Sequence, residues 1–181
     1  TGAKLDFRGE HYRHTLMTPM FRPDPNPYGP PRVMLAAVGP MMTKVAAECA
    51  DGLLVHGFTT ARYLREVTMP IVEAGLASAG RTRADFTTSY PGLIVTGNSE
   101  AEYQAAQDRV RHQIAFYGST PAYRSTLDCH GWGDLHVELN RLSKQNRWDD
   151  MTGLIGDEVL EAIAVVGPRK EIAARLKARL A

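Results

Sequence analysis

The sequence has little cysteine, no excess of either charge and no long apolar run. The net charge is +1 over 181 residues, so no basic excess indicates a nucleic-acid partner. Apolar runs are far shorter than the roughly 18 residues that span a membrane, and no signal-peptide pattern opens the sequence. Hydrophobic residues make up 44% and charged residues 23%, which is typical of a globular domain. These features predict a cytoplasmic protein that binds neither nucleic acid nor a membrane.

The scarce cysteines argue against a disulfide. Cys49 and Cys129 lie far apart, and Cys49 falls on the apolar face of an expected helix, which favours a buried thiol in a reducing compartment. Cys129 and three histidines are candidate zinc ligands, but their spacing matches no structural zinc pattern: His112, Cys129, His130 and His136. The sequence therefore predicts no bound metal.

The stretch 31–57 reads as strand, tight turn, helix and strand. Residues 33–38 form a continuous apolar run, typical of a strand in a parallel sheet that is buried on both faces. Gly39 suits the N-cap and Pro40 the first position of the helix, and residues 53–55 form a second apolar run. The apolar face of the helix is expected at Met42, Val45, Ala46 and Cys49. The stretch is therefore predicted to be a right-handed βαβ unit.

The turn after Val38 is a candidate anion site. The backbone N–H groups of Gly39, Met41 and Met42 lie at a helix N-terminus, where unpaired donors and the helix dipole favour negative charge. Gly39 lets a ligand approach the backbone closely. A phosphate site is one interpretation of this turn, and a plain connection between strand and helix is the other.

Outside this unit the sequence predicts further strands and helices in alternation. Residues 1–31 contain a short strand and turn, and then six prolines between Thr18 and Pro31 that exclude helix. A helix is expected from Thr59 or Thr60 to Ala79, with a kink at Pro70, and a strand at 86–96. The inner face of that helix is expected at Leu64, Val67, Ile71 and Ala74.

The remainder of the sequence is mainly helical. Ser99 and Glu102 form a capping box before a helix whose apolar stripe extends to Tyr117. More helices are expected at 121–129, from Asp134, from Asp149 or Asp150 through 160, and after 167–168, with a short extended segment at 164–166. The last helix is expected to bury Ile172, Ala173, Leu176 and Leu180. Alternating elements predict a parallel α/β sheet, in a barrel or an open doubly wound sheet, and three good strands are few for either.

Four segments resemble the bacterial-luciferase-like flavin and deazaflavin oxidoreductases, and above all the members that use coenzyme F-420. They are PPRVMLAAVGPMMTKVAAECADGLLVHG, EAGLASAGRTR, IAFYGSTPAYR and EAIAVVGPRKEIAARL. The resemblance implies a partial TIM (β/α)8 barrel with strands five to seven and extra C-terminal helices. Residues 1–181 would then be a single luciferase-like domain fragment. Residues 1–31 would be an insertion hairpin and Pro-rich crossing, residues 32–181 the barrel half, and the first barrel half would be absent.

The resemblance also implies site residues. The loop after strand five would contact the cofactor's ring edge and phosphate through Ala36, Ala37, Val38, Gly39, Pro40, Met41 and Met42. Substrate-side candidates are His56, Tyr117, Tyr123 and Arg124. Their plainer interpretations are a hydrogen-bonded loop histidine for His56, core packing for Tyr117 and a solvated side chain for Arg124. Proton-transfer residues of the family lie on loops after the early strands, which this sequence does not contain.

Three functions follow from the resemblance. The first is hydride transfer between coenzyme F-420 and an organic small-molecule substrate. The second is an FMN-dependent luciferase-like monooxygenase. The third is a non-catalytic barrel fragment that acts as a ligand-binding or assembly module. In each case the exposed strand edges would be covered by the missing barrel half or in a homo-oligomer.

Overall fold

The structure, a computed structural model, describes residues 3–24 and 26–180. Residue contacts divide the chain into two units, residues 1–32 and residues 33–181. The first unit contains the expected hairpin, in which β1 (Phe7–Arg8) pairs antiparallel with β2 (Arg13–His14). Its only other regular element among the described residues is a 3-10 turn, η1 (Pro19–Phe21). Pro25 of the proline-rich stretch lies outside the described residues.

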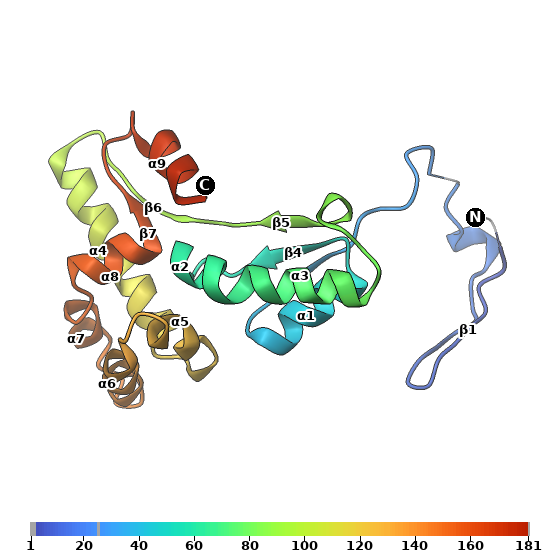
Figure 1. The fold of residues 1–181 in the computed structure, drawn as a ribbon, viewed down its shortest axis with the longest axis horizontal. Coiled ribbons are helices and arrows are strands. Elements are labelled where there is room, and N and C mark those ends of the chain that lie inside the picture. Colours follow the sequence, from blue (N-terminus) through green and yellow to red (C-terminus); the bar gives the residue numbers. More distant parts are fainter. Residues whose placement is uncertain (1–2, 25, 181) are drawn as a thin grey trace. The chain divides into compact units, whose positions relative to one another are not determined.

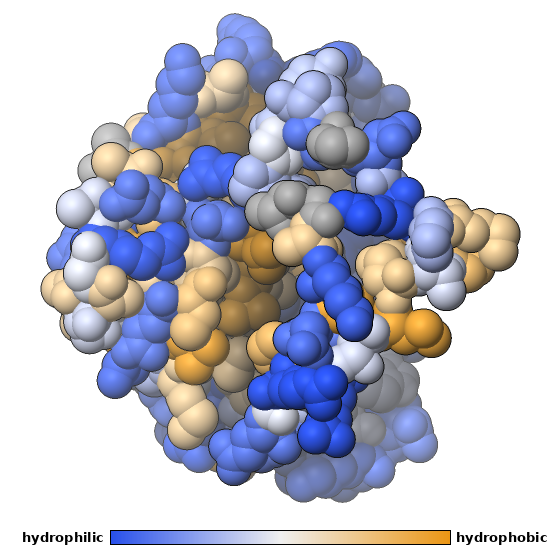
Figure 2. All heavy atoms as spheres, turned by 90° about the vertical axis from the view of Figure 1, so that its right-hand side faces the viewer, coloured by the Kyte–Doolittle hydropathy of each residue, from blue (hydrophilic) through white to orange (hydrophobic). Residues whose placement is uncertain are grey.

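The first unit buries little of its apolar surface. Its most exposed large apolar side chains are at least 70% accessible: Tyr12, Leu16, Met20, Phe21 and Tyr28. Apolar residues are also visible among hydrophilic ones on the molecular face drawn in Figure 2. The hairpin therefore holds its shape through backbone pairing and local contacts, without a core of its own.

The second unit begins with the predicted βαβ unit. Strand β3 (Met34–Ala37) pairs parallel with β4 (Gly52–Val55), and β4 pairs parallel with β5 (Thr87–Ser89). Helix α1 (Pro40–Cys49) connects β3 to β4 and packs with α3 (Met69–Ser78) on one face of these strands (Figure 1). The core between them contains fully buried side chains: Ala46, Ala47, Leu53, Val72 and Leu76.

The strand predicted at 86–96 consists of two strands. Strand β5 pairs with β4, whereas β6 (Leu93–Val95) pairs parallel with β7 (Ala164–Val166). The segment 90–92 pairs with neither, and its Pro91 has no N–H to donate to a ladder. Residues 164–166, predicted only as a short extended segment, form β7. The described residues therefore contain five parallel strands, in the two sheets β3–β4–β5 and β6–β7, so the expectation of three strands was too low.

Helix α1 buries a different face from the predicted one. Its buried residues are Thr43, Ala46 and Ala47, whereas Met42, Val45 and Cys49 are exposed. The prediction of a buried Cys49 thiol is therefore wrong. The reason is close packing on α3, where a Cβ on Gly75 would lie 2.8 Å from the Ala47 Cβ. Small residues allow this approach, so α1 turns its small side chains, and not its large ones, toward the core.

A π-helical turn shifts the buried face of the next helix. Helix α2 (Ala61–Tyr63) continues through the π turn η2 (Leu64–Thr68) into α3, and Thr60 caps it by accepting a hydrogen bond from the Tyr63 N–H at 3.0 Å. A π turn contains more residues than an α turn, so the face advances in steps of four: Leu64, Thr68, Val72 and Leu76. Of the predicted inner face, Leu64 is buried, Val67 and Ile71 are half-buried beside the smaller cavity, and Ala74 is exposed, so the prediction was wrong at Ala74. Pro70 lies in the first turn of α3, directly after η2.

Helices α4 to α8 form a second core around β6 and β7 (Figure 1). They are α4 (Glu100–Gly118), α5 (Arg124–Asp128) after a 3-10 turn η4 (Pro121–Tyr123), α6 (Gly133–Ser143), α7 (Trp148–Gly153) and α8 (Asp157–Ile163). The Ser99 hydroxyl caps α4 as predicted, accepting from the Glu102 N–H. The helix predicted from Asp149 or Asp150 through 160 is divided between α7 and α8. Asp134 lies in the first turn of α6 and is not its N-cap.

The last helix, α9 (Ile172–Leu180), is held mainly by polar contacts. None of its described side chains is buried, so its predicted apolar face does not form a core contact. Instead the Arg179 guanidinium donates to the carbonyls of Ala162, Ile163 and Ala164 at 2.7–2.9 Å, at the end of α8. These carbonyls have no partners within the helix, so a cation satisfies them and complements the helix dipole.

The parallel strands leave apolar side chains exposed. Leu54 is 40% exposed and Ile94 43% exposed, and Ala36 beside Leu54 is exposed as well. Parallel sheets ordinarily have both faces covered. These residues, Ala36 and Leu54 of the β3–β4–β5 sheet and Ile94 of the β6–β7 sheet, are together termed the open sheet face. Separately, no helix within residues 3–24 and 26–180 has the length and hydropathy of a membrane span.

We predict that the contact between α1 and α3 tolerates no larger side chain at Gly75. Gly75→Val should lower the free energy of unfolding by about 1–3 kcal/mol, because the new atoms would overlap Ala47 and the Lys44 carbonyl. Gly153→Ala is the control, since a Cβ on this helical glycine meets nothing within 4 Å and should not lower stability. Thermal unfolding measures both, and equal stability of the two variants would contradict this packing.

Candidate functional site

The turn between β3 and α1 leaves an accessible helix N-terminus. Gly39 has φ +78°, and its carbonyl accepts hydrogen bonds from the Thr43 N–H at 3.1 Å and the Thr43 hydroxyl at 2.8 Å. A Cβ on Gly39 would meet nothing within 4 Å, so there is open space beside this backbone. No side chain caps the helix and no acidic residue lies in its first turn. These features fit the phosphate of a cofactor, which would approach the amides of Met41 and Met42.

His56 follows β4 and is fixed by one backbone hydrogen bond and two rings. Its Nδ1 accepts from the Phe58 N–H at 3.1 Å. The ring stacks on Tyr123, with centroids 4.5 Å apart and planes at 17°, and meets Tyr117 edge-on at 4.7 Å and 87°. Because Nδ1 accepts, the neutral imidazole carries its proton on Nε2.

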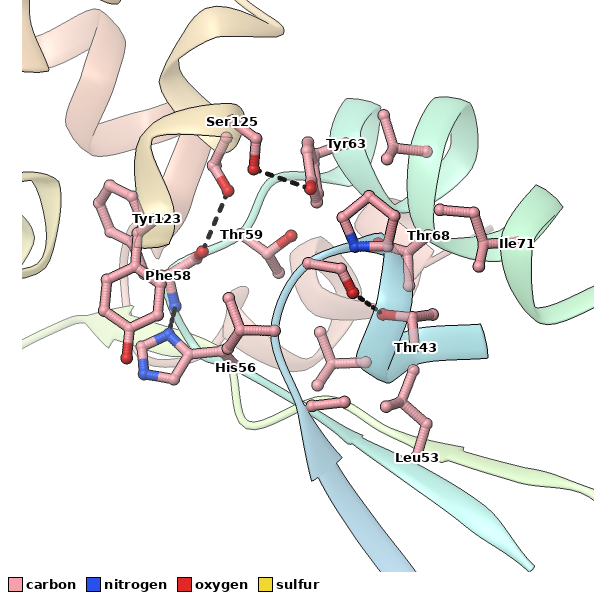
Figure 3. A pocket seen from close by; sticks show the side chains of 17 residues that line it. Thr43, Leu53, His56, Phe58, Thr59, Tyr63, Thr68, Ile71, Tyr123 and Ser125 are labelled. Carbon is pink, nitrogen blue, oxygen red and sulfur yellow. Dashed lines mark hydrogen bonds between the residues drawn. The ribbon is translucent and has the colours of Figure 1, made fainter. Parts of the chain in front are cut away.

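Polar contacts hold helix α5 against the loop after β4, and this docking brings Tyr123 to His56 (Figure 3). The Tyr63 hydroxyl is 2.9 Å from the Ser125 hydroxyl, and the Thr126 hydroxyl donates to the Phe58 carbonyl at 3.5 Å. Beside them, the Thr60 hydroxyl lies 2.8 Å from His130 Nε2. The stack on His56 is therefore the result of contacts between segments that are distant in sequence.

Two adjoining cavities lie at this end of the strands. The larger has a volume of about 430 Å³ and is lined by Ala36, Ala37, Val38, Leu54, Val55, His56, Gly57, Pro91, Leu93, Gln113 and Tyr117. The smaller, of about 30 Å³, is drawn in Figure 3, and its lining includes Gly39, Pro40, His56, Thr59 and Tyr123. The smaller cavity has room for about one water molecule, whereas the larger can hold an organic molecule.

The sequence-predicted residues divide between these cavities and the surface. The larger cavity is lined by Ala36 and Tyr117, and the smaller cavity by Gly39, Pro40 and Tyr123. Both cavities are lined by Ala37, Val38 and His56. Met41 and Met42 line neither, and their side chains are exposed, so at the turn only their backbone amides are available to a ligand. Arg124 also lies outside both linings, because its Nε pairs with the Asp128 carboxylate at 3.1 Å along α5.

The linings are uncharged. No Asp, Glu, Lys or Arg occurs among the described residues that line either cavity. Burial lowers the pKa of His56 from its ordinary value, which keeps its imidazole neutral at pH 7. The Thr59 hydroxyl is buried in the lining of the smaller cavity without a hydrogen-bond partner among the described residues. The helix dipole at the turn is therefore the main electrostatic feature beside these cavities.

Sequence reasoning missed Gln113, Phe58 and Thr59. Gln113 Nε2 donates to the Tyr117 hydroxyl at 3.3 Å from one turn earlier on α4. The sequence did contain a signal for this contact, because Gln113 lies four positions before Tyr117 and therefore on the same face of the helix. Phe58 and Thr59 carried no signal, because their positions follow from the docking of α5.

The four zinc candidates contact other groups, and the Cys129 thiol lies 3.9 Å from the Glu66 carboxylate. His136 Nδ1 is 2.7 Å from the Gly118 carbonyl, and His112 contacts the Thr152 hydroxyl at 3.2 Å. His130 stacks on Trp132. Among the residues that the structure describes, no three His, Cys, Asp or Glu side chains are grouped to hold a metal ion.

The chain is similar to known proteins over its whole length. The family described as luciferase-like monooxygenase matches residues 1–181. An uncharacterized protein of Mycobacterium tuberculosis is 54% identical over 178 residues, which is 98% of this chain and 52% of that protein. The 5,10-methylenetetrahydromethanopterin reductase of Archaeoglobus fulgidus is 26% identical over 181 residues, 97% of this chain and 51% of the reductase. The chain thus spans about half the length of these curated relatives.

Two further similarities concern proteins described as dependent on coenzyme F-420. The tetrahydromethanopterin reductase of Methanopyrus kandleri matches in structure with a TM-score of 0.67 at 22% identity, over 82% of this chain and 41% of that one. The fold is therefore α/β with parallel strands, similar to part of the TIM barrel of that reductase. The glucose-6-phosphate dehydrogenase of Nakamurella multipartita is 30% identical over 109 residues, 60% of this chain and 30% of the dehydrogenase.

We predict that His56 is a neutral Nε2–H tautomer at pH 7. Its pKa should lie below the ordinary value of about 6.5 because its ring is partly buried. The unfolded chain then binds this proton at higher pH than the folded chain, so the free energy of unfolding decreases as pH falls below about 6.5. Nitrogen-15 NMR of the imidazole measures tautomer and pKa. Tyr123→Leu should move the pKa back toward its ordinary value, and an Nδ1–H tautomer would contradict the assignment.

Proposed function

Because the chain belongs to the luciferase-like monooxygenase family, we propose that it forms the cofactor-binding part of a coenzyme F-420-dependent oxidoreductase. The observation that carries the proposal is the accessible helix N-terminus at Gly39, at the same end of the strands as His56 and the larger cavity. The F-420-dependent dehydrogenase of Nakamurella multipartita and the F-420-dependent reductase of Methanopyrus kandleri support this cofactor. FMN, which also bears a phosphate, is the alternative.

The residues of this chain would bind and orient, and bound coenzyme F-420 would supply the hydride chemistry. The phosphate would lie on the amides of Met41 and Met42, with the backbone of Gly39 in contact. The ring would extend along Ala36, Ala37 and Val38 toward the larger cavity. His56 and Tyr117 would contact the substrate there, while Tyr123 would fix the His56 ring. Proton-transfer residues are expected in parts of the family fold that lie outside this chain.

The open sheet face supports a further proposal about assembly. Ala36, Leu54 and Ile94 would be covered by the remaining barrel strands of the full protein or by a second copy of the chain, because apolar parallel sheets ordinarily have both faces buried. A non-catalytic module remains the alternative of another class. A full-length protein that binds neither coenzyme F-420 nor FMN would favour it.

The cofactor prediction is tested by titrating coenzyme F-420, and separately FMN, into the full-length protein that contains this chain. Gly39→Ala should weaken F-420 binding by at least about tenfold, because the methyl group fills the space through which the phosphate approaches the amides. Gly80→Ala is the matched control. Gly80 also has a positive φ, +66°, and open space around its Cβ position, but it ends α3. It should also add backbone strain, though less than at Gly39, whose φ of 78° and ψ of 165° are adopted almost only by glycine, and it should leave the dissociation constant unchanged. Equal affinity of both variants would contradict a phosphate at this turn.

The assembly prediction is tested by placing a charge on the open sheet face. Ile94→Lys should destabilise the full-length protein by several kcal/mol if that face is covered, because an unpaired charge would be buried; Ile94 lies outside the lining of the larger cavity. Val137→Lys is the control, since Val137 is 56% exposed on α6 and its substitution should change stability by less than about 0.5 kcal/mol. Equally small effects at both positions would show that the face is open to solvent.

A further inference from the structure

The larger cavity combines an apolar wall with three neutral polar side chains. Its apolar wall comes from β3, β4 and β6 and from the 90–92 connection, with Leu54, Val55 and Leu93 among its largest members. The polar side chains are His56, Gln113 and Tyr117. None of the described residues in this lining carries a formal charge once His56 is neutral. Such a wall favours a molecule that is itself mostly apolar and uncharged.

The hydrogen bonds in this cavity leave two ring donors at one corner, while the Gln113 Oε1 stays an acceptor. His56 Nδ1 already accepts from the Phe58 N–H, so the ring presents its Nε2–H. The Tyr117 oxygen accepts from Gln113 Nε2 at 3.3 Å, which leaves the Tyr117 hydroxyl hydrogen for another acceptor. The two rings meet edge-on with centroids 4.7 Å apart, so both donors belong to one corner of the cavity. A ligand that satisfies them must offer an oxygen as acceptor.

We propose that this cavity binds the substrate, and that the substrate is an uncharged, largely apolar organic molecule held by a carbonyl or hydroxyl oxygen on His56 Nε2–H and the Tyr117 hydroxyl. The inference rests on the proposed oxidoreductase function and adds the substrate class and two specificity-determining residues. A phosphorylated or carboxylated substrate would lose its hydration here without meeting a cation from this chain. Discrimination against anionic molecules is therefore expected from the lining itself.

The experiment uses the full-length protein loaded with coenzyme F-420 and two matched probes. Cyclohexanone is the uncharged probe, and 4-oxocyclohexanecarboxylate is the same ring ketone with a carboxylate. Equilibrium binding, followed through the His56 imidazole NMR signals, should favour cyclohexanone by at least about tenfold. His56→Phe and Tyr117→Phe should each weaken cyclohexanone binding by about tenfold, the effect of losing one neutral hydrogen bond. For the His56 variants binding is followed through the cyclohexanone signals. His56→Gln, which retains an N–H donor, should restore part of the affinity that His56→Phe loses.

The outcomes separate the failure of this inference from failure of the proposed function. A protein that binds no coenzyme F-420 would refute the proposed function. If it binds the cofactor but prefers the carboxylated probe, or binds neither ketone, the substrate class is overturned. If His56→Phe and Tyr117→Phe weaken cofactor binding instead of cyclohexanone binding, the two donors hold the cofactor, and their assignment to the substrate is overturned. Unchanged cofactor affinity together with weaker cyclohexanone binding supports the inference.

Discussion

The parallel pairing of β3 with β4 is the constraint on which the rest of the site depends. Its register places Ala37 beside Val55, so the chain leaves both strands at the same edge of the sheet. Val38 and Gly39 therefore emerge next to His56 and Gly57, although helix α1 separates them in sequence. A slip of one residue would turn Leu53 and Val55 away from the α1 and α3 core and would move His56 to the other face. The core that fixes the register thus also fixes the distance between the turn and the histidine.

This edge of the sheet offers two different binding environments, one at the turn and one in the larger cavity. At Gly39 the protein offers backbone amides and a helix dipole, which suit a charged group that stays near solvent. In the larger cavity it offers an apolar wall and neutral donors, which suit an uncharged group removed from solvent. Because no charged side chain among the described residues lines either cavity, the attraction that these residues exert on anions is confined to the turn. A single ligand bridging both regions would need a charged end and a neutral ring, and phosphate-bearing ring cofactors have this form.

Local sequence signals predicted the elements that local chemistry determines. Thr60 and Ser99 cap their helices, Gly80 ends α3 with a positive φ, and the βαβ unit is present. The errors arose where tertiary contacts override periodicity. Close packing against Gly75 selects the small face of α1 and leaves Cys49 exposed, and η2 changes the helical period in the middle of a helix. The candidate site was only partly predictable for the same reason. The turn is encoded locally, whereas the stacking of Tyr123 on His56 depends on bonds such as Tyr63–Ser125 that join distant segments.

The π turn at Leu64–Thr68 has a consequence for how this helix tolerates changes in length. A π turn holds one residue more than the α-helical turn it replaces, so it can gain or lose that residue without moving the segments on either side. A deletion elsewhere in α3 would instead rotate every following residue by about 100° and turn Val72 and Leu76 away from α1. Length variation among homologous sequences in this helix should therefore concentrate in these five positions, while the spacing from Met69 to Gly80 stays constant.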